Sequence, residues 1–337
     1  MKPSPLGILL VNLGTPDAPT TTAIRRYLAE FLVDPRVVNI PQIIWRPILY
    51  SFILPFRPAK LVARYTAIWG NEGAPIRHYT ALLAEKVEQS LNRQSIDHSN
   101  QNNFIVKSAM TYGNPSLKDG LAELQQQGAQ KLIIIPLFPQ YSASTSAAVF
   151  DKLAKIFSQT KTLPDIHFIA NYHLEPSYIN AVVTSIKRVI KKELAADEML
   201  LFSFHGLPQA QADAGDPYPL QCERTAAAIV SQLGLRAPQS QITYQSRFGP
   251  APWLQPYTCD VLADLPRQGI RKLFVVCPGF AVDCLETLQE IEVENRDIFM
   301  SAGGETYTYI PALNADELHS EVMVKLINSQ LSLATAD

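Results

Sequence analysis

Short apolar runs alternate with amphipathic stretches along the whole chain, and this alternation restricts the fold more than any other feature. Each run has the length of a buried strand, and the intervening stretches space their apolar residues as helices do. The strand candidates are residues 7–13, 103–108, 131–137, 167–171, 199–204, 242–245 and 272–277. The clearest helix candidates are residues 82–91, 116–127 and 178–194. Such alternation produces βαβ units with right-handed crossovers, so it predicts an α/β fold with parallel sheets.

The length of the chain predicts two domains, because 337 residues exceed the usual size of a single hydrophobic core. We predict two doubly wound domains, residues 1–138 and 139–310, with the boundary at the polar run that begins at Pro139. A last helix over residues 316–330 lies within the segment 311–337. We expect it to pack back on the N-terminal domain.

Composition and cysteine spacing exclude several classes of protein. The net charge of −2 gives no general attraction to nucleic acid. The first residues lead directly into a strand-like run, and no apolar stretch approaches the ~20 residues of a membrane span, so we expect a cytoplasmic protein. Cys222, Cys259, Cys277 and Cys284 form no C-x-x-C pair, which indicates neither a zinc site nor an iron–sulfur cluster. A single glycine, Gly14, after the first strand does not make a phosphate-binding loop.

His205 stands where a predicted buried strand meets the breakers Gly206 and Pro208. In open α/β sheets, ligands bind at the carboxyl ends of the strands. A neutral imidazole there can accept a proton or coordinate a metal near neutral pH. The alternative is a structural histidine that bonds a backbone carbonyl. The residues alone leave both open.

The segment after the last predicted strand carries carboxylates at helical spacing. At about 100° per residue, Asp283, Glu286, Glu290 and Glu294 fall within one arc of about 80°. One interpretation is a solvated acidic face that the positive end of the helix dipole favours. The other is a row that faces a cleft, where repulsion and burial raise some pKa values and allow protons or cations to be passed on.

Residues 40–57 are too short and too interrupted by proline to span a bilayer, yet too apolar for an ordinary surface loop. They are either a helix buried between domains or an apolar lip, about residues 40–56, of a pocket for a large flat ligand. Such a lip also suggests a weak peripheral contact with a membrane. Arg57, Lys60 and Arg64 beyond it are placed to meet carboxylates on the ligand.

Six motifs distributed nearly end to end closely resemble those of bacterial ferrochelatases, which insert ferrous iron into a porphyrin in the last step of haem synthesis. They are LVNLGTP (10–16), PQYS (139–142), SFHGLP (203–208), GDPYP (215–219), FGPAPWL (248–254) and CLETL (284–288). The resemblance implies two Rossmann-like domains of the chelatase type, without nucleotide, and an active-site cleft between them. It implies protoporphyrin IX and Fe²⁺ as substrates and no permanently bound cofactor. No obligate protein partner is indicated.

The resemblance also assigns residues. The catalytic and metal-binding site falls to His205 and Glu286, with Asp283 and Glu290 continuing the acidic line. The porphyrin pocket falls to Leu13, Trp45, Ile48, Leu49, Arg57, Lys60, Tyr65, Tyr112 and Trp253. Ala74 and Thr111 replace a serine and an arginine of some relatives, so not every propionate contact carries over. Cys284 replaces a histidine of animal relatives, and their cysteine-bearing C-terminal extension is missing, so no iron–sulfur cluster is expected.

Two other functions remain open on the sequence. One is a chelatase for another pair of substrates, such as coproporphyrin with iron or a corrinoid precursor with cobalt. The other is a carrier of a tetrapyrrole or a metal that performs no chemistry, because a fold does not fix a function.

Overall fold

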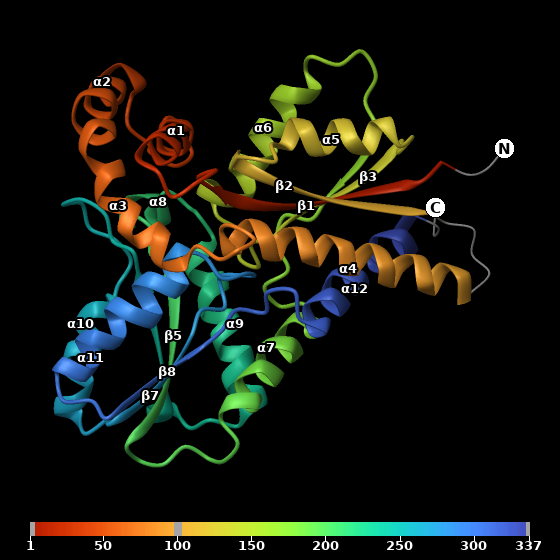
Figure 1. Cartoon of the computed structure of the whole chain (residues 1–337). Helices are drawn as coiled ribbons and strands as arrows, with labels where there is room; N and C mark the ends of the chain where they lie inside the picture. The colour runs from red at the N-terminus through yellow and green to blue at the C-terminus, as the bar shows by residue number, and fades with distance from the viewer. Residues whose placement is uncertain (1–3, 98–102, 335–337) are drawn as a thin grey trace. The chain divides into compact units, whose positions relative to one another are not determined.

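The computed structural model describes residues 4–97 and 103–334, which form two α/β units, each built on a four-stranded parallel sheet (Figure 1). The first unit ends at Phe138, resumes over Ala143–Asn171 and resumes again from Ala315. The second unit consists of Pro139–Ser142 and Tyr172–Asn314. Strands buried on both faces are apolar throughout, which explains the continuous apolar runs of the sequence.

The predicted domain limits are wrong for the segment after the first crossing. Residues 143–171 belong to the first unit, not to a domain over 139–310, because β4 (Asp165–Phe168) pairs in parallel with β3 (Lys131–Pro136). The chain therefore enters the second unit for four residues, returns, and crosses again at Tyr172. Residues 311–314 stay with the second unit, since Asn314 hydrogen-bonds Asp283 there.

The sheet of the first unit has the strand order β2-β1-β3-β4. Its remaining strands are β1 (Leu6–Thr15) and β2 (Phe104–Gly113). Helices α5 (Leu117–Gln126) and α6 (Ala148–Phe157), the latter preceded by the π-helical turn η2 (Ala143–Ala147), lie on one side of this sheet. On the other side lie α4 (Pro75–Asp97) and α12 (Glu317–Ala334), which pack together (Figure 1).

Three helices precede α4 in the connection from β1 to β2: α1 (Thr21–Leu32), α2 (Gln42–Ile48) and α3 (Leu54–Ile68). The π-helical turn η1 (Leu49–Ile53) joins α2 to α3, so the predicted lip is helical rather than a loop. It packs on α1 within the first unit. Among residues 4–97 and 103–334, no helix combines the length and the apolar composition needed to cross a membrane.

The sheet of the second unit has the order β6-β5-β7-β8. Its strands are β5 (Glu198–His205), β6 (Ser240–Gln245), β7 (Lys272–Val276) and β8 (Thr306–Ile310). Helices α7 (Pro176–Val189) and α9 (Tyr218–Leu233) lie on one side, and α10 (Thr258–Asp264) and α11 (Arg296–Ser301) on the other (Figure 1). The connections contain α8 (Gln209–Asp213), η3 (Ala237–Gln239), η4 (Leu265–Gln268) and the ten-residue π-helix η5 (Glu286–Asn295).

Two features of the second unit differ from the sequence predictions. The edge strand β8 was not predicted, because its Thr and Tyr residues alternate with each other and form no apolar run. The acidic segment is a π-helix rather than an α-helix, and Asp283 precedes it. A π-helix is wound more widely than an α-helix, so the rotation of 100° per residue assumed in the prediction does not apply to it. Residues four apart, such as Glu286 and Glu290, still lie on the same side of the helix.

Candidate active site

The candidate site lies at the carboxyl edge of the second sheet, where β5 and β7 end. Because β5 is the first strand of its unit and lies between β6 and β7, successive connections leave it in opposite directions. Such topological switch points are where open α/β sheets bind ligands. His205 is the last residue of β5, and the acidic helix η5 follows β7. The topology therefore brings the histidine and the carboxylates to one edge.

The ring of His205 has a defined protonation pattern. Its Nδ1 lies 2.7 Å from the carbonyl oxygen of Gly206. A carbonyl can only accept, so Nδ1–H is the donor and, in the neutral ring, Nε2 carries the available lone pair. The contact to a backbone carbonyl, expected of a structural histidine, also orients the ring as a base or ligand through Nε2.

Aromatic rings surround His205. The rings of Trp253 and Phe280 lie 6.5 Å and 6.4 Å from the imidazole, centroid to centroid. The loop after β5 pairs with the chain at Trp253, since Leu254 N–H donates to the carbonyl of Leu207 at 2.9 Å. The backbone is also packed closely at Gly206, because a Cβ there would lie 2.7 Å from the carbonyl oxygen of Gln245. The predicted wall residue Trp253 is thus beside the predicted base.

Glu290 is held by the residue that follows β6. The N–H of Ser246 donates to its Oε1 at 2.7 Å, and the Ser246 hydroxyl donates to its Oε2 at 2.5 Å. Burial raises the pKa of Glu290 above its ordinary value, and the charge of Glu286 adds to the rise. The Ser246 bonds and the charge of His205 oppose it without cancelling it. Glu290 is therefore electrostatically linked to both predicted site residues.

Glu286 opens η5 and is half-buried. Its backbone carbonyl accepts a hydrogen bond from Nε2 of Gln245 at 3.3 Å, which ties the start of η5 to the end of β6. In the ladder Gln245 is the partner of His205. Its Oε1 accepts from the Ser203 hydroxyl at 2.9 Å, so the amide is fixed at both ends. One glutamine thus couples the histidine strand to the acidic helix.

The predicted relay residue Asp283 has a structural place instead. It is buried, and its carboxylate accepts hydrogen bonds from the hydroxyls of Thr287 and Tyr309 at 2.9 and 2.6 Å and from the Asn314 amide at 2.6 Å. The N–H of Ala312 approaches it at 3.4 Å. A carboxylate so fully engaged anchors the start of η5 to the end of β8. It does not extend the row of Glu286 and Glu290, so its predicted catalytic role is not supported.

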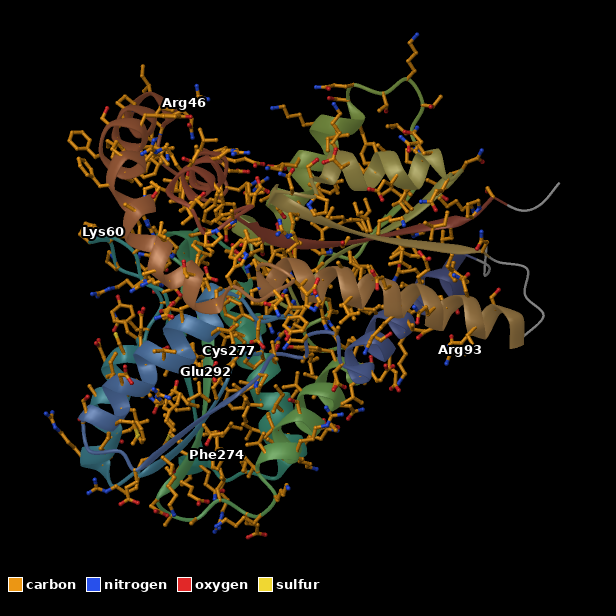
Figure 2. All side chains as sticks on the ribbon, in the orientation of Figure 1. Arg46, Lys60, Arg93, Phe274, Cys277 and Glu292 are labelled. Atoms are coloured by element: carbon orange, nitrogen blue, oxygen red, sulfur yellow. The ribbon has the colours of Figure 1, made fainter. Side chains whose placement is uncertain are left out.

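The cysteines near this edge are buried. Burial raises the pKa values of Cys277 and Cys284 well above the ordinary thiol value, and the carboxylates of Asp283 and Glu286 respectively add to the rise. Both thiols therefore stay protonated at neutral pH. Figure 2 marks Cys277 after β7 and Glu292 on η5. Within the part of the chain that the structure describes, no three or more His, Cys, Asp or Glu side chains are grouped to hold a metal ion.

The predicted lip residues have different environments within the first unit. Trp45 and Leu49 are buried, and Nε1–H of Trp45 donates to the carbonyl of Leu32 at the end of α1 at 2.6 Å. Ile48 is 38% exposed, and several apolar neighbours are more so: Ile43, Ile44, Tyr50, Phe52 and Phe56. Trp45 thus fastens α2 to α1 and Leu49 belongs to the core, whereas Ile48 belongs to an exposed apolar surface.

The basic residues that follow the lip lie on α3. Burial lowers the pKa of Arg57 from its ordinary value, with a smaller opposing contribution from Tyr65. Tyr65 itself is buried, whereas Lys60 is exposed. Figure 2 shows Lys60 on α3 and Arg46 on the neighbouring α2. The surface is therefore basic as well as apolar.

The remaining pocket candidates, Leu13 and Tyr112, lie at the ends of β1 and β2. Leu13 is half-buried. Tyr112 is fully buried: its hydroxyl donates to Asp34 at 2.9 Å, and Nζ of Lys152 lies 4.0 Å from the centre of its ring. These contacts hold Tyr112 in the core of the first unit.

The sequence reasoning missed three residues around His205. Gln245 ends β6, Ser246 follows it directly, and Phe280 follows β7. A strand prediction that ended at Gln245 already placed this residue and the next at the carboxyl edge of the sheet. What it lacked was the strand order, which brings β6 beside β5.

Comparisons with known proteins identify the family. A family model described as ferrochelatase matches residues 5–331. The coproporphyrin III ferrochelatase of Streptococcus mutans is 46% identical over 98% of this chain and 100% of its own length. The ferrochelatase of Aeromonas hydrophila is 47% identical over 97% of this chain and 98% of its own length. That of Haemophilus influenzae is 45% identical over 98% and 99%.

A solved structure of SirB from Bacillus subtilis with Fe³⁺ has a similar fold, with a TM-score of 0.53 at 12% sequence identity. The match covers 99% of this chain and 98% of SirB. At this identity the likeness shows the fold alone. It confirms the predicted α/β architecture of the chelatase type, with two parallel sheets.

Proposed function

The chain belongs to the ferrochelatase family, and from that premise we propose that it inserts Fe²⁺ into protoporphyrin IX and releases two protons. A free-base porphyrin carries two N–H protons inside a planar ring. Metal entry therefore needs a distorted ring with exposed nitrogen lone pairs, and bases that accept both protons. A pocket can supply the distortion from binding energy spread over the large apolar ring.

The observation that supports this function most directly is the orientation of His205. Its Nδ1–H is engaged by the Gly206 carbonyl, so Nε2 is the nitrogen able to accept a pyrrole proton. The two aromatic rings beside it suit a flat apolar substrate. General-base catalysis of this kind typically contributes about 10²–10⁴ in rate.

We assign the acidic residues to the metal and the second proton. Glu286 carries the first carboxylate of η5, and Glu290 adds a second, influenced by the charges of both Glu286 and His205. Imidazole with carboxylate is a suitable ligand set for a transient ferrous ion. Few strong ligands are an advantage here, because the iron is a substrate that must pass on to the porphyrin.

The first unit supplies groups suited to the porphyrin itself. Ile48 and the exposed apolar residues of α2 and η1 are proposed to contact the macrocycle, and Arg57 and Lys60 to meet its propionates. The same surface is proposed to make a weak peripheral contact with anionic lipid, since residues 42–68 contain four basic residues and no acidic one. Co-sedimentation with vesicles of anionic and of neutral lipid measures this contact. Stronger binding to the anionic vesicles would support it.

Coproporphyrin III is the second candidate substrate. The Streptococcus mutans relative, which carries that substrate in its name, is as similar to this chain as the relatives named simply ferrochelatase. The two porphyrins differ in the number of propionates, so discrimination falls to basic residues such as Arg57 and Lys60.

The test is anaerobic metallation of both porphyrins with Fe²⁺, followed by absorption spectroscopy, with kcat and KM determined for each. We expect multiple turnovers with protoporphyrin IX. A higher kcat/KM for coproporphyrin III would transfer the assignment to that substrate. Tight binding of either porphyrin without turnover would instead identify a carrier.

A further inference from the structure

Ser246 has a backbone conformation that its residue type rarely adopts. Its φ is +64°, in the left-handed region where a Cβ is crowded and glycine is favoured. Such conformations are unfavourable, and they persist where the surrounding structure holds them, often at functional sites. Ser246 stands directly after β6, whose last residue is the ladder partner of His205.

The conformation allows one residue to direct two donors at one carboxylate. The backbone N–H of Ser246 reaches Oε1 of Glu290 at 2.7 Å, and its hydroxyl reaches Oε2 at 2.5 Å. Both carboxylate oxygens are therefore restrained, so Glu290 has little freedom to rotate. Hydrogen bonds to an ionised acceptor are about twice as strong as neutral ones, which makes this pair an effective restraint.

We propose that Ser246 is a positioning residue for metallation, which fixes the carboxylate of Glu290 at the edge of the sheet that carries His205. This inference rests on the proposed function, in which Glu290 assists Glu286 and His205. Ser246 itself contacts neither the porphyrin nor the iron. Its effect on the reaction passes entirely through Glu290.

The residue type supports this role. Glycine at position 246 would adopt the left-handed conformation without strain and keep the N–H, but it would lack the hydroxyl. Alanine would lack the hydroxyl and keep the strain. Serine supplies both donors, so the strain is retained together with a bond that neither glycine nor alanine can make.

The central experiment compares Ser246→Gly with wild type in anaerobic metallation and thermal unfolding. We expect kcat to fall about tenfold, as for other groups that orient a metal-site side chain, with KM for the porphyrin unchanged. Relief of the strain and loss of the hydroxyl bond oppose each other, so Tm should change little. A purely structural serine predicts a lower Tm without a selective loss of kcat.

Two further variants complete the comparison. Ser246→Ala should show the same loss of kcat with a lower Tm. Ser240→Ala removes a serine hydroxyl from the other end of β6 and should leave kcat, KM and Tm near wild type. If Ser246→Ala fails to fold, Ser246→Gly still decides the question.

A double-mutant cycle with Glu290→Gln tests whether the effect passes through Glu290. We expect Ser246→Gly to reduce kcat no further in the Glu290→Gln background, because the side chain it positions has already lost its function. Independent, multiplicative losses would overturn the proposal. So would a raised KM with unchanged kcat, which would make Ser246 a porphyrin contact.

The wild-type arm separates this inference from the proposed function. Wild type that metallates neither porphyrin overturns both. Wild type that is active, together with a fully active Glu290→Gln, overturns the role of Ser246 and leaves the reaction intact. An active wild type, an impaired Glu290→Gln and an unimpaired Ser246→Gly overturn the positioning role alone.

Discussion

The two units have the same strand order but different residues at equivalent strand ends. In each, the first strand lies between the second and the third, so each has its switch point beside β1 or β5. Strand β1 ends in Leu13, Gly14 and Thr15, none of them ionisable. Strand β5 ends in Ser203, Phe204 and His205. In the same topology, the first strand thus ends in uncharged residues in the first unit and in a base in the second.

The connections next to these strands continue the contrast. After β1 the first unit inserts α1 to α3, which expose Ile43, Phe52 and Phe56 to solvent. After β7 the second unit places η5, with Glu286 and Glu290. The comparison teaches that the fold supplies equivalent positions, while the side chains decide which of them performs chemistry and which binds an apolar surface.

The largest expected effect is that of His205→Ala. Removing the proposed base should lower kcat about 10²–10⁴-fold. Stability should change little, because the half-buried ring makes one hydrogen bond to a neighbouring carbonyl. Metallation kinetics and thermal unfolding measure both. His167→Ala, in β4 of the first unit, is the matched control and should keep its activity. Equal losses in the two variants would remove the contrast between the units.

The next effect is that of Glu286→Gln. The change is nearly isosteric but removes a proton acceptor and a metal ligand, so kcat should fall about a hundredfold while porphyrin affinity is retained. Glu292→Gln, on an exposed part of the same helix, is the control and should be close to wild type. Fluorescence titration with porphyrin and single-turnover metallation separate binding from chemistry. Wild-type metallation by Glu286→Gln would refute its assignment.

Leu49 and Ile48 sharpen the account of the first unit, because they are adjacent but differ in burial. Leu49→Ala should lower the free energy of unfolding by about 2–3 kcal/mol, since it empties a buried site. Ile48→Ser should leave stability nearly unchanged and weaken porphyrin binding. Denaturant unfolding and porphyrin titration measure the two effects. If both variants lost stability and bound porphyrin with unchanged affinity, residues 48 and 49 would have a purely structural role.

Glu290 links chemistry to pH. Because burial raises its pKa in the folded state above the ordinary value of 4.5, the folded protein holds this proton to higher pH than the unfolded chain does. Stability from this residue is therefore present at acid pH and is lost as pH rises through the raised pKa. Glu290→Gln removes that dependence, so its Tm relative to wild type should rise with pH across this window. A Tm difference that is constant with pH would contradict the burial of the charge.

Activity should follow the opposite sign. The proton-accepting form of Glu290 is lost as pH falls through the same pKa, so wild-type metallation should decline on the acid side. Glu290→Gln should lower kcat about tenfold, less than Glu286→Gln, and reduce this contribution to the acid limb. An unchanged kcat and pH profile in the variant would exclude Glu290 from proton transfer.

Much of this arrangement was readable from sequence, and the misses have physical causes. Apolar runs identified seven strands, the edge strands β2, β4 and β6 among them, whereas the alternating Thr and Tyr residues of β8 form no such run. His205 was identifiable because strand ends are marked by Gly and Pro. Asp283 was placed on the acidic face by its spacing, whereas its partners Tyr309 and Asn314, which come from beyond the helix, could not be predicted from that spacing.

Ser246 and Tyr112 show the remaining limit of sequence patterns. A serine after a strand has no distinctive signal, because its importance depends on a left-handed φ and on Glu290, 44 positions away. Tyr112 lies at a strand end as a pocket residue would, but Asp34 and Lys152 enclose it. Local sequence patterns predicted the secondary structure, but they could not predict which polar side chains pair over long distances in the chain.

The smallest effect concerns one tyrosine from each unit. Tyr112→Phe removes a hydrogen bond to Asp34, and Tyr307→Phe removes one to the backbone carbonyl of Ile291 at 2.8 Å. Each should lower the free energy of unfolding by about 1 kcal/mol, the usual net value of one such bond. Of these two tyrosines, only Tyr307 bonds the backbone of η5, at the residue after Glu290. We therefore expect Tyr307→Phe to reduce kcat about twofold, an effect below 1 kcal/mol, while Tyr112→Phe leaves both kcat and porphyrin affinity unchanged. Chemical denaturation paired with metallation kinetics measures both variants, and a loss of porphyrin affinity in Tyr112→Phe would restore that residue to the pocket wall.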